Sequence, residues 1–181
     1  MRELIVGSAR LLLLHTPHAG TFCAGADLRE RRTMSPAQVS DFLDSLRCLI
    51  SELESVQVPS IGVVDGYALG GGTEIALGCD LRVGGTYIPP VPDHHECIDG
   101  RLTVAGSGTI MSLPEAKLGI IPGAGGTQRM TKLVGMAKAK ELIYTGKRVN
   151  GPEAERIGTS TYPSAPCNLR VSTCGDSETW S

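Results

Sequence analysis

The chain has 181 residues, of which 41% are hydrophobic and 20% are charged, and its formal net charge at pH 7 is -2. This length and composition suit one globular domain with a hydrophobic core, and they exclude a disordered or fibrous chain. The near-neutral charge, without a dominant run of lysine or arginine, argues against nucleic acid or an anionic membrane as the main partner.

The first half of the chain predicts a strand, a turn and a long helix. Residues 11–15 form a short apolar run typical of a strand, and a glycine-rich turn follows at residues 24–27. Residues 35–38 (Ser-Pro-Ala-Gln) form a capping-box pattern that starts a helix, and Pro59 marks its stop. Apolar residues at helical spacing predict a core-facing stripe without chemistry: Val39, Phe42, Leu43, Leu46, Leu49, Ile50 and Leu53.

The second half alternates short strands with helices. Strands are predicted at residues 60–65 and 81–83, and a tight turn at residues 66–72 leads into a helix that opens at residues 73–78. Two more helices are predicted at residues 138–145, stopped by Gly146, and at residues 152–157, stopped by Gly158. This alternation predicts an α/β fold with crossover connections.

Two stretches lack this periodicity, namely residues 84–104, with three prolines, and residues 159–181, which are rich in Ser, Thr, Cys and Pro. Both predict loop or disorder. Residues 93–97 (Asp-His-His-Glu-Cys) offer metal-ligand types in a row, but adjacent side chains rarely point at one ion, so we expect no metal site. No apolar run approaches the roughly 20 residues of a membrane helix, and no signal or transit peptide is expected.

The cysteines show no C-x-x-C spacing, which predicts free thiols in a reducing compartment. They are Cys23, Cys48, Cys79, Cys97, Cys167 and Cys174.

Two glycine-rich turns and two glutamates are the candidate chemistry. Each turn follows an apolar strand, and two main-chain N–H groups converging from such turns on one oxygen would form an oxyanion hole. Glu74 lies in the first turn of a predicted helix, and Glu115 follows a proline. Two carboxyl groups near one polarised carbonyl can divide the base and acid roles needed to add water to a conjugated double bond. The alternatives are ordinary tight turns and solvated surface acids.

Three long segments, in this order, resemble the active-site motifs of the enoyl-CoA hydratase/isomerase (crotonase) family. They run from Phe22 to Leu28, from Asp65 to Glu74 and from Pro114 to Arg129. The resemblance implies the crotonase-like ββα spiral core and an acyl-CoA thioester as the substrate. It implies no cofactor beyond the coenzyme A of the substrate and no metal.

The resemblance also implies roles for individual residues. The main-chain N–H groups of Ala26 and Gly71 would bind the thioester oxygen. Glu74 and Glu115 would hold the attacking water, with Glu74 helping to activate it and Glu115 passing a proton to the α-carbon. The positions that match the family's contacts with the substrate and its coenzyme A are Ala24, Ala26, Asp27, Leu28, Arg29 and Gly71.

The presence of both glutamates favours a hydratase over an isomerase, because family isomerases generally use one acid at the position of Glu115. Residues 29–35 and Lys117 look similar to the methylglutaconyl-CoA hydratase branch of leucine breakdown. The resemblance implies a homotrimer or hexamer. It also implies a location in the mitochondrial matrix, whereas the lack of an expected transit peptide allows a cytoplasmic location. An RNA-binding helix found in one member type has no counterpart, so we expect no nucleic-acid partner and no membrane partner.

Departures from the family pattern predict an incomplete domain over residues 1–158. The family's N-terminal strands and first helix have no counterpart, residues 84–104 form an insertion between the two acids, and residues 159–181 form a non-family tail. The C-terminal helices that make the family's trimer contact and close its acyl pocket would be absent. The two non-family stretches suggest translated intron or frame-shifted sequence. The alternatives to an active hydratase are therefore a catalytically impaired fragment and an isomerase or hydrolase on the same scaffold.

Overall fold

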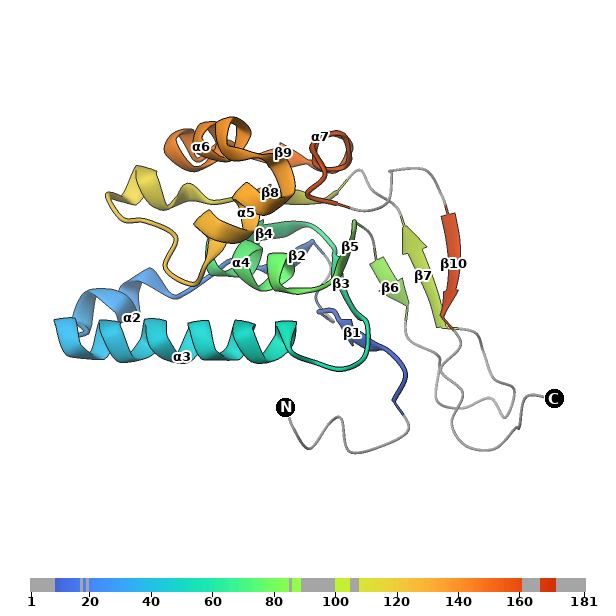
Figure 1. The fold of residues 1–181 in the computed structure, drawn as a ribbon, viewed down its shortest axis with the longest axis horizontal. Helices are drawn as coiled ribbons and strands as arrows, with labels where there is room; N and C mark the ends of the chain where they lie inside the picture. The colour runs from blue at the N-terminus through green and yellow to red at the C-terminus, as the bar shows by residue number, and fades with distance from the viewer. Residues whose placement is uncertain are drawn as a thin grey trace.

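The computed structural model describes residues 9–16, 18, 20–84, 86–88, 100–104, 108–160 and 167–171. In Figure 1 the long helix α3 (Pro36–Glu54) lies along one side of the strands, and α5 (Gly126–Val134), α6 (Met136–Thr145) and α7 (Gly151–Ile157) lie on the other. Parallel strands joined through helices confirm the predicted α/β class. No helix within the described residues is long and apolar enough to cross a membrane.

The first sheet is entirely parallel, in the order β1-β3-β5. Its strands are β1 (Leu12–Leu14), β3 (Ser60–Val64) and β5 (Leu81–Gly84), which confirm three predicted strands. All five residues of β3 are buried, as expected of a central parallel strand covered on both faces. Ile61, Val63 and Val83 share one face of the sheet and form a small hydrophobic cluster there.

The second sheet has the order β2-β4-β8-β9, with β9 antiparallel to β8. Its strands are β2 (Thr21–Cys23), β4 (Tyr67–Leu69), β8 (Ile110–Ser112) and β9 (Val149–Asn150). The sequence predicted only a tight turn at residues 66–72, but β4 lies inside that segment and pairs on both edges. A three-residue strand between glycines carries too little periodicity to distinguish it from a turn.

The main core lies between the second sheet and helices α4 (Gly71–Gly78), α5, α6 and α7. It is apolar, and its members come from strands and helices far apart in the sequence. They are Val64, Ala68, Ala76, Leu77, Met111, Leu113, Met130, Ala139, Leu142, Val149 and Ala154. The helices α3, α4, α6 and α7 agree with the predicted ones, and Ser35 and Gln38 make both bonds of the predicted capping box.

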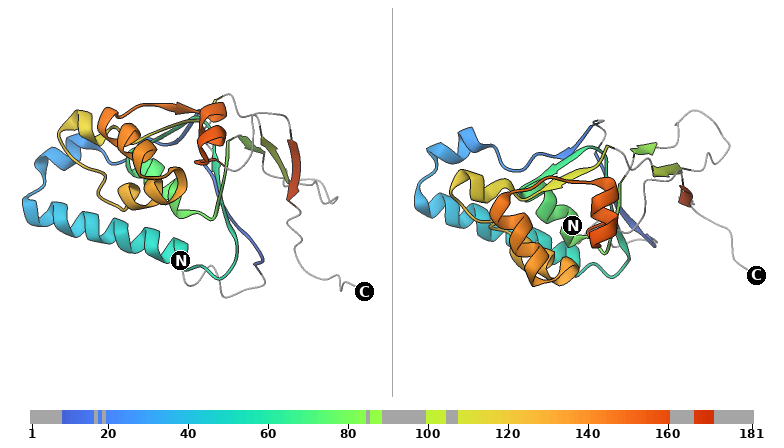
Figure 2. Two further views of the ribbon diagram at one scale, coloured as in Figure 1. Left: turned by 45° about the horizontal axis from the view of Figure 1, so that its top comes forward. Right: turned by 90° about the horizontal axis from the view of Figure 1, so that it is seen from above.

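The prediction of loop or disorder at residues 84–104 and 159–181 is wrong for several of these residues. Strands β6 (Thr86–Ile88), β7 (Gly100–Val104) and β10 (Cys167–Val171) form an antiparallel sheet in the order β10-β7-β6. These runs are short and flanked by turn-forming residues, so they gave no clear pattern. Figures 1 and 2 show this sheet at the end of the molecule away from α2 (Leu28–Thr33).

The start of the predicted tail is packed against the body of the protein. Thr159 and Ser160 are buried, the carbonyl of Thr159 accepts a hydrogen bond from Arg82 Nε at 2.8 Å, and the hydroxyl of Ser160 donates to the carbonyl of Arg82. The candidate metal residues 93–97 lie outside the described residues. Among the cysteines, Cys23, Cys48 and Cys79 are free thiols, as predicted.

The start of α4 and the end of β2 approach each other very closely at Gly72. A Cβ atom placed on Gly72 would lie 2.1 Å from the carbonyl oxygen of Cys23, which belongs to the backbone and cannot rotate away. Glycine is therefore required for this contact between the two glycine-rich segments.

We expect Gly72→Ala to lower the free energy of unfolding by about 1–3 kcal/mol, because the backbone of β2 or α4 must move. Gly108→Ala is the matched control, since a Cβ at Gly108 meets no atom within 4 Å. Urea denaturation of both variants measures the difference. Equal stability of the two variants would contradict the close approach.

Candidate active site

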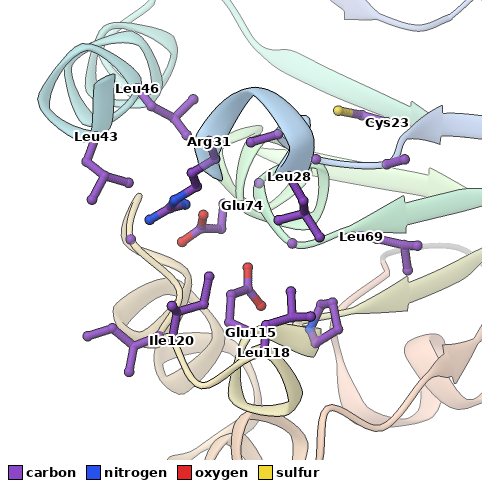
Figure 3. A pocket seen from close by; sticks show the side chains of 18 of the residues that line it. Cys23, Leu28, Arg31, Leu43, Leu46, Leu69, Glu74, Glu115, Leu118 and Ile120 are labelled. Carbon is purple, nitrogen blue, oxygen red and sulfur yellow. The ribbon is translucent and has the colours of Figure 1, made fainter. Parts of the chain in front are cut away.

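A pocket of about 550 Å³ opens between the β2–α2 connection, α3, the start of α4 and the 3-10 helix η1 (Pro114–Leu118). Figure 3 shows Glu74 and Glu115 on facing walls of this pocket. Most of the other lining side chains are apolar, and they include Phe42, Leu43, Leu46, Leu69, Ile75, Leu118 and Ile120. The pocket therefore offers two acids to an apolar ligand segment.

The helical stripe of α3 divides between two environments. Ile50 and Leu53 at its C-terminal end are buried, as predicted for core residues. Phe42, Leu43 and Leu46 line the pocket instead, so the expectation that this stripe has no part in the site is wrong for them. Leu49 is 44% exposed and joins neither environment. Helical spacing identifies the inward face of a helix but not whether that face meets protein or a cavity.

Glu74 is 2% exposed and lies in the first turn of α4. Its Oε1 accepts two main-chain hydrogen bonds, from the N–H groups of Ala124 and Gly126, each at 2.8 Å. The N-terminus of a helix also favours a negative charge there. These donors compensate a buried carboxylate and fix the orientation of its second oxygen.

Glu115 is 7% exposed and is the second residue of the 3-10 helix, directly after Pro114. Its Oε2 is buried without a hydrogen-bond partner among the described residues. Burial raises the pKa of Glu115, and the charge of Glu74 raises it further, whereas its own main-chain N–H and the charge of Arg31 lower it. The two acids therefore differ, because Glu74 accepts two short main-chain hydrogen bonds, whereas Oε2 of Glu115 is buried without a partner among the described residues.

The two glycine-rich segments of the predicted oxyanion hole are in contact. A Cβ placed on Gly25 would lie 2.8 Å from the carbonyl oxygen of Leu69 and 3.4 Å from the nitrogen of Gly71. Gly71 is the first residue of α4, where a main-chain N–H has no acceptor within the helix. Ala26 and Gly71 both line the pocket. Whether their two N–H groups meet at one ligand oxygen stays a prediction.

The predicted contacts with the substrate divide into two groups. Ala24, Ala26, Leu28 and Gly71 line the pocket. Asp27 and Arg29 are exposed and are not among the residues that line it. The carboxylate of Asp27 instead caps α2 by accepting a hydrogen bond from the N–H of Arg29 at 2.8 Å.

Two cationic residues of the pocket were not predicted as site residues, namely Arg31 and Lys117. In Figure 3 the guanidinium group of Arg31 points from α2 toward Glu74. Leu28 and Arg31 are three residues apart and therefore share a face of α2. The three-residue spacing of Leu28 and Arg31 is visible in the sequence, but it indicates a shared face only if this six-residue segment forms a helix.

Comparison with known proteins identifies the family of the chain. The model of the enoyl-CoA hydratase/isomerase family matches residues 8–86 and 99–162. A mouse protein, enoyl-CoA hydratase domain-containing protein 2, mitochondrial, is 45% identical over 156 residues, which are 86% of this chain and 46% of the mouse protein. Human methylglutaconyl-CoA hydratase, mitochondrial, is 41% identical over 153 residues, which are 84% of this chain and 39% of the human protein.

Among solved structures, the enoyl-CoA hydratase of Bacillus anthracis superposes with a TM-score of 0.75 at 35% identity. The match covers 90% of this chain and 56% of the bacterial one. The fold and the pocket thus define a crotonase-fold protein. The chain belongs to the enoyl-CoA hydratase/isomerase family.

The chain spans about half the length of the known proteins that it matches or less. The matched ranges include residues 84–86, 99–104 and 159–162, which the sequence interpretation placed outside the family.

The unpartnered carboxyl of Glu115 predicts a pH-dependent cost to stability. Because its pKa is raised in the folded protein, the folded state holds this proton more tightly than the unfolded state. The resulting stabilisation is complete below the ordinary value of 4.5 and is lost as the pH rises through the folded pKa. At pH 7 the carboxyl is ionised in the unfolded chain, so folding must either bury that charge or take up a proton, and both cost free energy.

We expect Glu115→Gln to raise the free energy of unfolding by about 1 kcal/mol at pH 7, and by less at pH 4, because glutamine carries no charge. Urea denaturation at both pH values measures this, with Glu155→Gln on the exposed face of α7 as the control. An equal gain at pH 4 and pH 7 would refute the assignment of the cost to the charge of Glu115.

Proposed function

We propose that the pocket catalyses the addition of water to a 2-enoyl-CoA thioester. The observation that carries this proposal is the pair of buried, inequivalent glutamates in one apolar pocket. Glu74, with donors on one oxygen, has the environment of a base, and Glu115, with its raised pKa, has that of an acid.

In the proposed reaction, the thioester oxygen binds the main-chain N–H groups of Ala26 and Gly71, which withdraw electrons from the conjugated double bond. Glu74 accepts a proton from water as the hydroxyl oxygen adds to the β-carbon. The negative charge that develops on the thioester oxygen is stabilised by the two N–H groups, and Glu115 delivers a proton to the α-carbon. No metal or separate cofactor is required, because coenzyme A is part of the substrate.

The first test is the hydration of crotonyl-CoA, followed by the loss of its conjugated absorbance. We expect Glu74→Gln and Glu115→Gln each to lower kcat by about 10²- to 10⁴-fold, because each removes a proton-transfer group. Glu155→Gln should leave kcat unchanged. A purified, folded wild-type chain that consumes no crotonyl-CoA would instead favour an impaired fragment, and movement of the double bond without water addition would favour an isomerase.

We further propose that the acyl group carries a free carboxylate at the end distant from the thioester, as in 3-methylglutaconyl-CoA. Arg31 supports it, since a cation on the wall of a largely apolar pocket is stabilised by an anionic ligand. Arg31 forms no ion pair within 4 Å with any residue that the structure describes. The similarity to human methylglutaconyl-CoA hydratase supports the same substrate class.

We expect Arg31→Leu to lower kcat/KM for 3-methylglutaconyl-CoA by about 10- to 100-fold, because a charge-assisted hydrogen bond is lost. The same change should affect crotonyl-CoA, which has no distal carboxylate, less strongly, because for that substrate Arg31 acts only through its charge on Glu115. Arg32→Leu, on the exposed face of the same helix, is the matched control. An equal loss with both substrates would refute recognition of a carboxylate by Arg31.

The proposed assembly is a homotrimer or hexamer in the mitochondrial matrix. The mouse and human relatives are named mitochondrial, which supports the location. Exposed apolar side chains on α5 and α6 support a contact between subunits, namely Leu133, Met136 and Tyr144. Size-exclusion chromatography coupled to light scattering measures the assembly directly, and a stable monomer would contradict it.

A further inference from the structure

The loop at residues 123–126 turns successive carbonyl groups away from Glu74. The carbonyl of Gly123 accepts a hydrogen bond from Arg47 Nε, and that of Ala124 accepts one from Arg129 Nη1, each at 2.7 Å. The carbonyl of Gly125 accepts bonds from the N–H groups of Gln128 at 3.1 Å and Arg129 at 3.0 Å. Every carbonyl from residue 123 to residue 125 is thus held by a donor.

Two peptide units of this loop donate to Glu74, and the unit between them, from Ala124 to Gly125, is held by the guanidinium group of Arg129. The unit between Gly123 and Ala124 has its carbonyl on Arg47 and its N–H on Glu74. The unit between Gly125 and Gly126 has its carbonyl on the first turn of α5 and its N–H on Glu74. A trans peptide unit is planar, and its C=O and N–H point in opposite directions. A donor that fixes the carbonyl therefore aims the N–H at the carboxylate.

Arg129 is itself held rigidly. Its Nε and Nη2 donate to the two carboxylate oxygens of Glu54 at 2.7 and 2.8 Å, while Nη1 donates to Ala124. The side chain of Arg129 is 13% exposed. The bond to Arg129 lowers the pKa of Glu54, so this carboxylate stays charged. The three donors of one planar guanidinium group thus join the end of α3 to the loop.

Gly125 fits this arrangement because of its conformation and its small size. It has φ 97°, which L side chains rarely adopt, and a Cβ there would lie 2.2 Å from Arg129 Nη1. The loop therefore passes directly against the guanidinium group.

We propose that Arg129, anchored by Glu54, and Arg47 are positioning residues for Glu74. They hold the peptide units of residues 123–126 so that two N–H groups converge on Glu74 Oε1 and direct its other oxygen into the pocket. Arg47, Glu54 and Arg129 are not among the residues that line the pocket, so they act through the loop and not on the substrate. The inference rests on the proposed hydration, in which Glu74 activates the water.

Arg129→Lys tests the geometry, because lysine keeps the charge but cannot make three bonds in one plane. We expect kcat for crotonyl-CoA to fall by about 10- to 100-fold with KM changed by less than about 2-fold, since misplacing the base weakens the transition state more than binding. Arg156→Lys, at an exposed site of α7, is the matched control and should change neither constant. A change confined to KM would overturn the inference.

A double-mutant cycle tests whether the arginine acts through Glu74. In a Glu74→Asp background the shorter carboxylate no longer meets the loop in the same way, so Arg129→Lys should lower kcat by less than about 3-fold. Two effects that multiply would show that Arg129 acts independently of Glu74 and would overturn the inference.

Arg47→Gln is a second variant that tests the loop from its other side. The side chain of Arg47 is 53% exposed, so its replacement leaves the core intact.

Amide hydrogen exchange measured by NMR gives a readout that does not need turnover. The N–H groups of Ala124 and Gly126 should exchange at least about 10-fold faster in Arg129→Lys and in Arg47→Gln, while the core amide of Met111 is unchanged. Unchanged exchange of Ala124 and Gly126 in both variants would overturn the inference. An inactive wild-type chain would refute the proposed hydration, whereas the exchange result would still decide whether the arginines orient the loop.

Discussion

The contact between Glu74 and two N–H groups of the 123–126 loop determines the geometry of the pocket. It joins residues 50 and 52 positions apart, and so it connects the first turn of α4 to the segment that precedes α5. A buried carboxylate without such donors would destabilise the fold or lose its charge. The glycines around it leave the necessary space, since a Cβ on Gly126 would lie 2.9 Å from Glu74 Oε1. The glycine at position 126 is thus explained by the close approach of the Glu74 carboxylate to the backbone of the loop.

Glu115 shows the opposite arrangement in the same pocket. A Cβ on Gly70 would lie 2.9 Å from its Oε1, so glycine makes room for this acid as well, but Oε2 is buried without a described partner. An unpartnered polar atom lowers stability, and such atoms persist where a function requires them. The fuller compensation of Glu74 than of Glu115 is a physical basis for separate base and acid roles.

The sequence predicted the parts of the fold that have strong local signals. The capping box at Ser35, the buried strand β3 and the glycine that ends α6 all have local causes, and all are present. The two glutamates were also found, because the motifs around them are long. Arg31 and the pocket-facing part of α3 were missed, since their position depends on the packing of α2 and α3 around a cavity. Periodicity within one element carries no information about such an arrangement.

The segment between Glu74 and Glu115 raises a geometric question, because catalytic groups tolerate only about 0.5 Å of displacement. Gly84, the last residue of β5, and Thr109, just before β8, lie on either side of this segment in the sequence. These two residues touch, since a Cβ on Gly84 would lie 2.5 Å from Thr109 Oγ1, and this hydroxyl also donates to the carbonyl of Val64 at 2.8 Å. A segment whose two ends lie in contact does not force β5 and β8 apart. The extra residues therefore do not separate the two acids, and β6 and β7 lie at the far end of the molecule from the pocket wall formed by α2 (Figure 1).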